Sequence, residues 1–110
     1  MADGGGVSVV LATVPDLEVG RQLARTLLDE RLIACANVVP GVTSLYRWQG
    51  RVHEDAECLV VMKTRTELVP RLVERVPALH PYELPEVLAL RVMDGLPAYC
   101  RWVMDETDGV

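Results

Sequence analysis

The chain has 110 residues, a formal net charge of −5, and a composition that is 50% hydrophobic and 25% charged. This size predicts one domain that buries about 65% of its unfolded surface, enough for a core without disulfides or a structural metal. The acidic balance and the lack of a basic stripe argue against nucleic acid and anionic membranes as partners, and no apolar run approaches the roughly 18 residues of a membrane span.

Patterns of apolar residues predict a flexible N-terminal tail, residues 1–6, followed by alternating strands and helices. Pro15 and Asp16 indicate the start of the first helix, with the proline in its first turn, and Pro70 is expected in the first turn of the second helix. Gln49-Gly50 is a turn signal between two long strands. The predicted elements are strand 7–14, helix 15–30, strands 34–48 and 51–64, helix 66–79, strand 86–92 and a last helix that begins at Pro97.

This order, βαββαβ with an additional C-terminal helix, is typical of an α+β ferredoxin-like sandwich with its helices on one face of an antiparallel sheet. We therefore predict a single domain over residues 7–110. Phenylalanine is absent, so the core must be built from aliphatic side chains and methionine.

The two central strands predict an extended β-hairpin that is too long for its own domain. Fifteen residues at about 3.3 Å each span about 50 Å, whereas a domain of this length has a diameter of roughly 35 Å. Alternate residues from Ala34 to Trp48 are expected to share one apolar face, and a bulge at Pro40 would shift the pairs beyond it. With a two-residue turn, the facing pairs are Trp48 with Arg51, Tyr46 with His53, Ser44 with Asp55, and Val42 with Glu57.

An apolar ribbon that overhangs its own domain invites pairing with another chain. We predict a tight homo-oligomer in which subunits share their hairpins, with Tyr46, Trp48 and Val42 as interface anchors. The alternative is a bent hairpin that wraps its own core.

The segment His80-Pro81-Tyr82-Glu83-Leu84-Pro85-Glu86 places a histidine, a phenol and two carboxylates ahead of a strand, in a shape restricted by two prolines. Imidazole and carboxylate donors suit Cu²⁺ or Zn²⁺, so His80, Glu83, Glu86 and Glu57 are candidate ligands for a divalent metal ion that the fold does not require. The alternative is that His80 hydrogen-bonds a neighbouring backbone group and closes the loop. No H-x₃-H or C-x₂-C spacing is present.

Lys63 ends a buried strand and Tyr82 lies in the polar segment, so both are candidates for binding a ligand. For Lys63, an ion pair with a carboxylate such as Glu86 is the alternative. No nucleophile elbow, phosphate loop or dinucleotide motif occurs, which indicates a protein that is not an enzyme. Three scattered cysteines and an N-terminus unlike a secretion signal predict reduced thiols in the cytoplasm.

Several segments carry a resemblance that extends over residues 7–105. They are Thr13-Val14-Pro15-Asp16, Leu32-Ile33-Ala34-Cys35-Ala36-Asn37-Val38-Val39-Pro40-Gly41, Ser44, Tyr46, Trp48, Gly50, Glu57, Lys63-Thr64, His80-Pro81-Tyr82-Glu83 and Pro85-Glu86.

In this order and spacing, the chain resembles the divalent-cation tolerance family, CutA. The resemblance implies a ferredoxin-like subunit, a compact homotrimer, and a role in tolerance of copper and other divalent metals. Since the family's trimer is similar to PII proteins, the resemblance also implies signalling or small-molecule binding as an alternative, and a scaffold for partner proteins is a third reading. Some bacterial members look as if they use a cysteine and a second histidine where this chain has Ala12 and Leu79, so a copper site that depends on both is excluded here.

Overall fold

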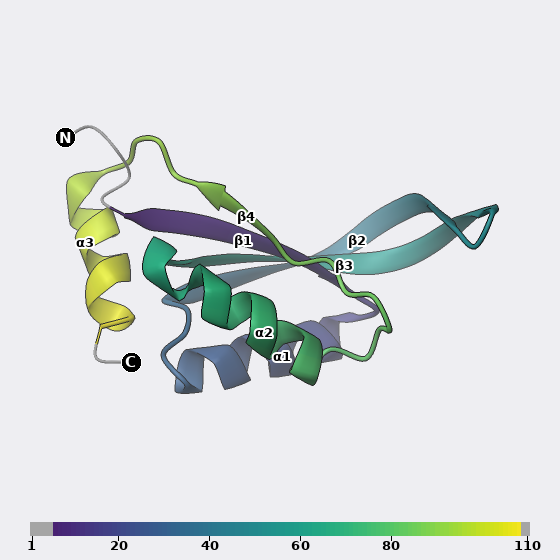
Figure 1. Cartoon of the computed structure of the whole chain (residues 1–110), viewed down its shortest axis with the longest axis horizontal. Helices are drawn as coiled ribbons and strands as arrows, with labels where there is room; N and C mark the ends of the chain where they lie inside the picture. The colour runs from purple at the N-terminus through teal and green to yellow at the C-terminus, as the bar shows by residue number, and fades with distance from the viewer. Residues whose placement is uncertain (1–5, 109–110) are drawn as a thin grey trace.

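A computed structural model describes residues 6–108, and the predicted tail, residues 1–6, lies outside the described residues apart from Gly6. The elements are β1 (Val7–Val14), α1 (Leu17–Asp29), β2 (Cys35–Trp48), β3 (Arg51–Arg65), the 3₁₀ turn η1 (Thr66–Leu68), α2 (Val69–Leu79), β4 (Leu88–Arg91) and α3 (Pro97–Glu106). The strands form one four-stranded antiparallel sheet in the order β2-β3-β1-β4. Helices α1 and α2 lie on one side of this sheet and α3 lies at one end (Figure 1). The predicted α+β element order is confirmed.

The main core lies between the sheet and the helices α1 and α2. Alternate residues of β1 and of the second half of β3 turn toward these helices, which explains why every second position is buried from Ser8 to Val14 and from Cys58 to Arg65. The buried members of this core are Val10, Ala12, Val14, Leu23, Leu27, Leu32, Ile33, Cys58, Val60, Met62, Leu68, Leu72 and Val76. A smaller cluster of Val7, Ala34, Cys100 and Val103 attaches α3 to the end of the sheet.

Helix α1 begins with a side-chain cap. The Oδ1 atom of Asp16 accepts a hydrogen bond from the backbone N–H of Val19 at 2.9 Å. Pro15 therefore precedes the cap, and the prediction that it lies in the first turn is wrong, because the cap needs an extended residue with a side-chain acceptor. Within the buried side of α1, Gly20 allows a close approach to β2, since a Cβ there would lie 2.8 Å from Cγ1 of Val38.

Helix α2 has Pro70 in its first turn, as predicted. The predicted continuous helix 66–79 instead opens with the 3₁₀ turn η1, because Pro70 has no N–H to bond the carbonyl of Thr66. The far end of α1 is tied to α2 by Arg75, which donates to both carboxylate oxygens of Glu30 at 2.8 and 2.7 Å. This bond lowers the pKa of Glu30.

Strand β4 is shorter than the predicted strand 86–92. It pairs with β1 only from Leu88 to Arg91, and Val92 adds a single backbone bond to Val7 at 3.0 Å. The preceding residues are held in the loop 80–87, which crosses the end of the sheet and has Pro85 without an N–H.

The predicted register of the distal hairpin, residues 42–57, is confirmed. Trp48 faces Arg51, Tyr46 faces His53, Ser44 faces Asp55 and Val42 faces Glu57. Gln49 and Gly50 form the turn with φ angles of 51° and 76°, as a two-residue hairpin turn with right-handed strand twist requires.

A bulge between Val39 and Val42 reverses the face on which β2 presents its side chains. Over this stretch β2 advances by one residue more than β3, and Gly41 adopts a φ of 79°. The prediction that alternate residues from Ala34 to Trp48 share one face is therefore wrong. Ala36 and Val38 pack against the core under the helices, whereas Val42, Tyr46 and Trp48 are in register with the opposite face of β3.

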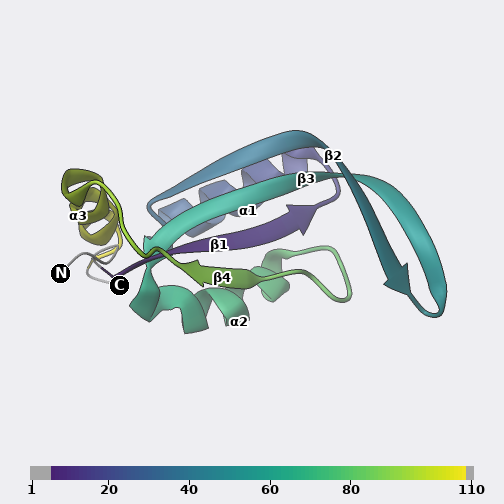
Figure 2. The same cartoon turned by 90° about the horizontal axis from the view of Figure 1, so that it is seen from above.

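The distal hairpin projects beyond the helices (Figure 1), and seen from above it bends toward the side of the sheet on which β4 lies (Figure 2). The molecule is accordingly elongated, with extents of 45 × 27 × 23 Å. Pairing between β1 and β3 ends at Val14 and Cys58, so residues 51–57 pair only with β2. Leu45 and Val52 are each 64% exposed, which shows that residues 6–108 leave the bent hairpin uncovered.

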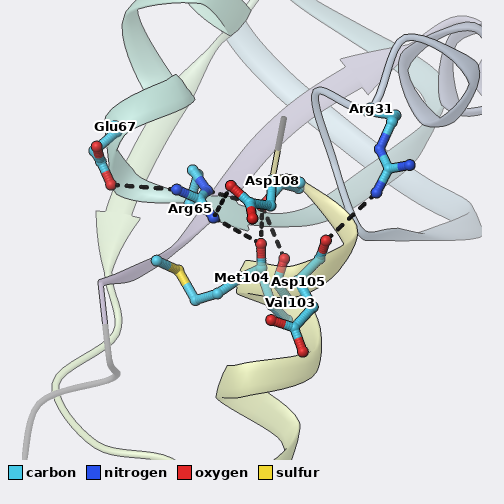
Figure 3. A network of polar contacts seen from close by, with 8 residues as sticks. Arg31, Arg65, Glu67, Val103, Met104, Asp105 and Asp108 are labelled. Atoms are coloured by element: carbon cyan, nitrogen blue, oxygen red, sulfur yellow. Dashed lines mark hydrogen bonds and ion pairs between the residues drawn. The ribbon is translucent and has the colours of Figure 1, made fainter. Parts of the chain in front are cut away.

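Helix α3 is held by a network of polar contacts that sequence reasoning missed (Figure 3). Arg65 of β3 donates to the Met104 carbonyl at 2.8 Å and lies 3.5 Å from Glu67 and 3.6 Å from Asp108. Arg31 donates to the Asp105 carbonyl at 3.4 Å. These cations meet the carbonyls at the negative end of the α3 dipole.

Candidate functional site

His80 follows α2 and is 8% exposed. Its Nε2 atom lies 2.7 Å from the carbonyl oxygen of Thr13, near the end of β1. Its Nδ1 atom accepts the backbone N–H of Tyr82 at 3.1 Å. The ring therefore joins the end of β1 to the start of the loop 80–87, which is the backbone-bonding alternative considered for this residue.

Tyr82 connects the same loop to β3. Its hydroxyl donates to Oε2 of Glu57 at 2.6 Å, and its ring lies against His80 with a centroid distance of 4.7 Å. Glu57 is 8% exposed and lies just beyond the end of β1 pairing. Burial, reinforced by the bond to Glu57, raises the pKa of the Tyr82 phenol, so the hydroxyl keeps its proton and its donor role.

The structure brings His80, Tyr82 and Glu57 together but does not gather the predicted metal ligands into one site. Glu83 is exposed and Glu86 is half-buried. Within residues 6–108, no group of three histidine, cysteine, aspartate or glutamate side chains is placed to hold a metal ion. Because metal sites need several converging donors, a single subunit does not provide a complete one in this part of the chain.

Lys63 lies away from the loop 80–87. Its ammonium donates to Oδ1 of Asn37 on the neighbouring strand β2, and not to Glu86, which was considered as an alternative partner. It lies six positions along β3 from Glu57, the partner of Tyr82, which corresponds to roughly 20 Å. Lys63 and Tyr82 therefore do not line a common cleft within one subunit.

The aromatic residues of the distal hairpin form a small polar cluster. The Tyr46 hydroxyl donates to Asp55, which raises the pKa of that phenol, and the Tyr46 ring stacks on His53 at 5.4 Å. His53 Nε2 lies 3.3 Å from the Trp48 carbonyl oxygen. Tyr46 remains 42% exposed, so the ring presents contact area to solvent.

The sheet face opposite α1 and α2, here called the open face, is apolar and lacks a covering layer in the described chain. Leu88, Leu90 and Val39 are 58%, 56% and 42% exposed on it. Register places half-buried aliphatic residues beside them: Val9, Leu11, Leu59 and Val61. Since Val42 is in register with Glu57 beyond Leu59, the predicted interface anchors of the distal hairpin continue this face.

One contact at the end of the open face was not anticipated from the sequence. The Tyr99 hydroxyl of α3 lies 3.4 Å from the Sγ atom of Cys35. This hydrogen bond, together with burial, raises the pKa of Tyr99 to about 12. Neither residue carries a local signal for the pairing, because it depends on how α3 docks on the sheet.

Comparison with known proteins gives a consistent result. The family model for the CutA1 divalent ion tolerance protein matches residues 8–106. The chain is 54% identical over 99 residues to the divalent-cation tolerance protein CutA of Thermus thermophilus, covering 90% of this chain and 96% of that protein. It is 44% identical over 106 residues to mouse protein CutA, covering 96% of this chain but only 60% of the mouse protein. The crystal structure of CutA from Xylella fastidiosa superimposes with a TM-score of 0.90 at 41% identity, covering 94% of this chain and 99% of that one.

Among residues 6–108, no helix combines the length and the apolar character needed to cross a membrane.

Proposed function

Because this chain belongs to the CutA1 divalent ion tolerance family, we propose that it serves divalent-cation tolerance as a non-enzymatic homotrimer in the cytoplasm. The cytoplasmic assignment is supported by the three cysteines, Cys35, Cys58 and Cys100, which are all free thiols. Reducing compartments maintain scattered thiols of this kind.

The observation that carries the trimer is the open face. Leu88 and Leu90 expose more than half of their surface there, beside the apolar side chains of β1 and β3. Contiguous apolar surface of this kind is rarely left to solvent and is typical of subunit interfaces. Contact with a neighbouring subunit would bury these apolar side chains of the open face.

The distal hairpin supports a closed ring rather than a two-fold dimer. The projecting hairpin and the body of the sheet are different parts of the subunit, so contact between the hairpin of one subunit and the sheet body of the next is head-to-tail. Head-to-tail contacts with a suitable rotation close into rings. The unpaired edge of residues 51–57 offers further backbone groups to a neighbour. The number of three subunits follows from the family resemblance.

A matched pair of variants tests this assembly. Leu90→Asp places a charge on the open face, at a residue 56% exposed in the subunit, whereas Val73→Asp does the same on α2 at a residue 48% exposed. We expect size-exclusion chromatography to show a shift to monomer for Leu90→Asp and no change for Val73→Asp. Wild-type elution at the mass of one subunit would refute the proposal.

For the metal itself, we propose binding of Cu²⁺ or Zn²⁺ by Glu83 and Glu86, completed by donors of a neighbouring subunit. Both carboxylates have solvent access, and hard oxygen donors bind divalent ions once enough of them converge. Isothermal titration with Cu²⁺ should show affinity reduced by about tenfold or more in the double variant Glu83→Gln/Glu86→Gln. The control Glu67→Gln should bind as the wild type does. Equal affinity of the double variant and the wild type would contradict this placement.

A second candidate is binding of a small anionic molecule between subunits, and Lys63 is the observation that favours it. Lys63 is a half-buried residue among aliphatic residues of the open face, and its ammonium donates to the neutral Asn37. A cation that becomes fully buried in an interface needs an anionic partner. In thermal-shift measurements, citrate and inorganic phosphate should raise the melting temperature of the wild type but not that of Lys63→Met. Absence of any shift, or an equal shift in Lys63→Met, would remove this candidate.

A further inference from the structure

We infer that His80 acts in this chain as a positioning residue, a neutral two-ended latch between the end of β1 and the loop 80–87, and that it does not ligate the divalent ion. This inference is independent of the proposed function, since it concerns the hydrogen bonds of one subunit.

The two hydrogen bonds of His80 define its chemical state. A backbone N–H is always a donor, so the Nδ1 atom that accepts the Tyr82 N–H at 3.1 Å must be unprotonated and must use its lone pair for this bond. A carbonyl oxygen is always an acceptor, so the Nε2 atom 2.7 Å from the Thr13 oxygen must carry the proton. Only the neutral Nε2–H tautomer satisfies both partners.

This state leaves His80 without a free lone pair for a metal. Coordination through Nδ1 would displace the Tyr82 N–H, and coordination through Nε2 would remove the bond to the Thr13 carbonyl. Either change leaves a backbone group without its partner next to a residue that is 8% exposed.

The surroundings of His80 offer no compensation. The positions at which the family resemblance implies additional ligands hold Ala12, which is fully buried, and Leu79, which packs against the core. These apolar side chains have no donor atom to share a metal with the imidazole.

The latch has a structural consequence at Tyr82. It fixes the backbone of Tyr82 three residues after α2 ends at Leu79, and the phenol then reaches the carboxylate of Glu57 at 2.6 Å. His80 thus holds the loop in the conformation that supplies Glu57 with its donor.

Long-range ¹H–¹⁵N NMR of the wild-type protein tests the inference directly, with Zn²⁺ alone as a diamagnetic probe. The His80 ring should give the pattern of a single Nε2–H tautomer, since this is the form that satisfies both of its hydrogen-bond partners. Addition of Zn²⁺ should leave both of its nitrogen shifts unchanged. A Nδ1–H tautomer, an averaged pattern, or a Zn²⁺-induced shift at either nitrogen would overturn the inference.

Variants provide a second readout through hydrogen exchange of the Tyr82 amide. His80→Leu removes both bonds, so exchange should accelerate by about tenfold, the equivalent of one lost hydrogen bond. His80→Asn restores an acceptor close to the Nδ1 position and should recover part of the protection, while the control His53→Leu should leave the exchange unchanged. An unchanged exchange rate of the Tyr82 amide in His80→Leu would overturn the inference. If that variant fails to fold, the His80 tautomer in the wild-type NMR spectrum still tests it.

The two proposals fail separately. If Zn²⁺ and Cu²⁺ bind nowhere on the protein, the metal part of the proposed function fails, and the tautomer of His80 in the metal-free spectrum still decides the latch. If Zn²⁺ binds and moves the His80 nitrogens, the latch fails and metal binding stands.

Discussion

Gly20→Ala tests the close packing between α1 and the base of the hairpin. The added Cβ would lie 2.8 Å from Cγ1 of Val38 and 3.3 Å from Cγ2 of Val14. Overpacking of this kind costs about 1–3 kcal/mol, while alanine gains about 1 kcal/mol over glycine in a helix interior. We therefore expect a net loss of about 1 kcal/mol in the free energy of unfolding, measured by urea denaturation at one fixed protein concentration.

A double-mutant cycle identifies the cause of that loss. Val38→Ala removes the methyl group that meets the new Cβ, at a cost of about 1–2 kcal/mol when made alone. The double variant Gly20→Ala/Val38→Ala should therefore be more stable than additivity predicts, by about 1 kcal/mol. Gly20→Ala combined with Val103→Ala, in the separate cluster under α3, should be additive. Stabilisation by Gly20→Ala, or additivity with Val38→Ala, would refute the packing argument.

Three further changes probe contacts described above. Arg75→Met removes the partner that lowers the pKa of Glu30 from its ordinary 4.5. The wild type should therefore be more stable than the variant above pH 4.5, and this difference should vanish as the pH falls through the lowered pKa of Glu30. Urea unfolding at a series of pH values measures it. Tyr82→Phe leaves the buried Glu57 carboxylate without this donor and should cost about 1–3 kcal/mol in the same assay, whereas Tyr82→Phe/Glu57→Leu should recover part of the loss. Arg65→Met releases the Met104 carbonyl at the end of α3, and limited proteolysis there should accelerate by about tenfold. No change in proteolysis would show that the apolar cluster alone holds α3.

The fold could be predicted because its signals are local. Apolar periodicity defined the helices and strands, and Gln49-Gly50 defined the hairpin turn and hence the pairing of residues 42–57. The sequence Pro40-Gly41 indicated an interruption of the strand, but it did not reveal that the bulge changes which face β2 presents. One extra residue moves every later side chain of β2 to the opposite face of the sheet. The face of Tyr46 and Trp48 was therefore assigned wrongly from alternation alone.

The candidate site was predictable only as a set of residues. The loop 80–87 was identified from His80 and Tyr82, but their partners lie far away in sequence, at Thr13 and Glu57. These pairs form only because the loop 80–87 passes the end of β1, and the sequence does not show this path. The same reason explains why the contacts of Arg65 with α3 escaped prediction.

Native mass spectrometry of the unmodified protein tests the central claim, that sister subunits cover the open face. One subunit has a mass of 12.2 kDa. We predict a dominant species of three times that mass, which persists on dilution because an apolar face of this kind is costly to expose. A dominant species at the mass of a single subunit would contradict the account.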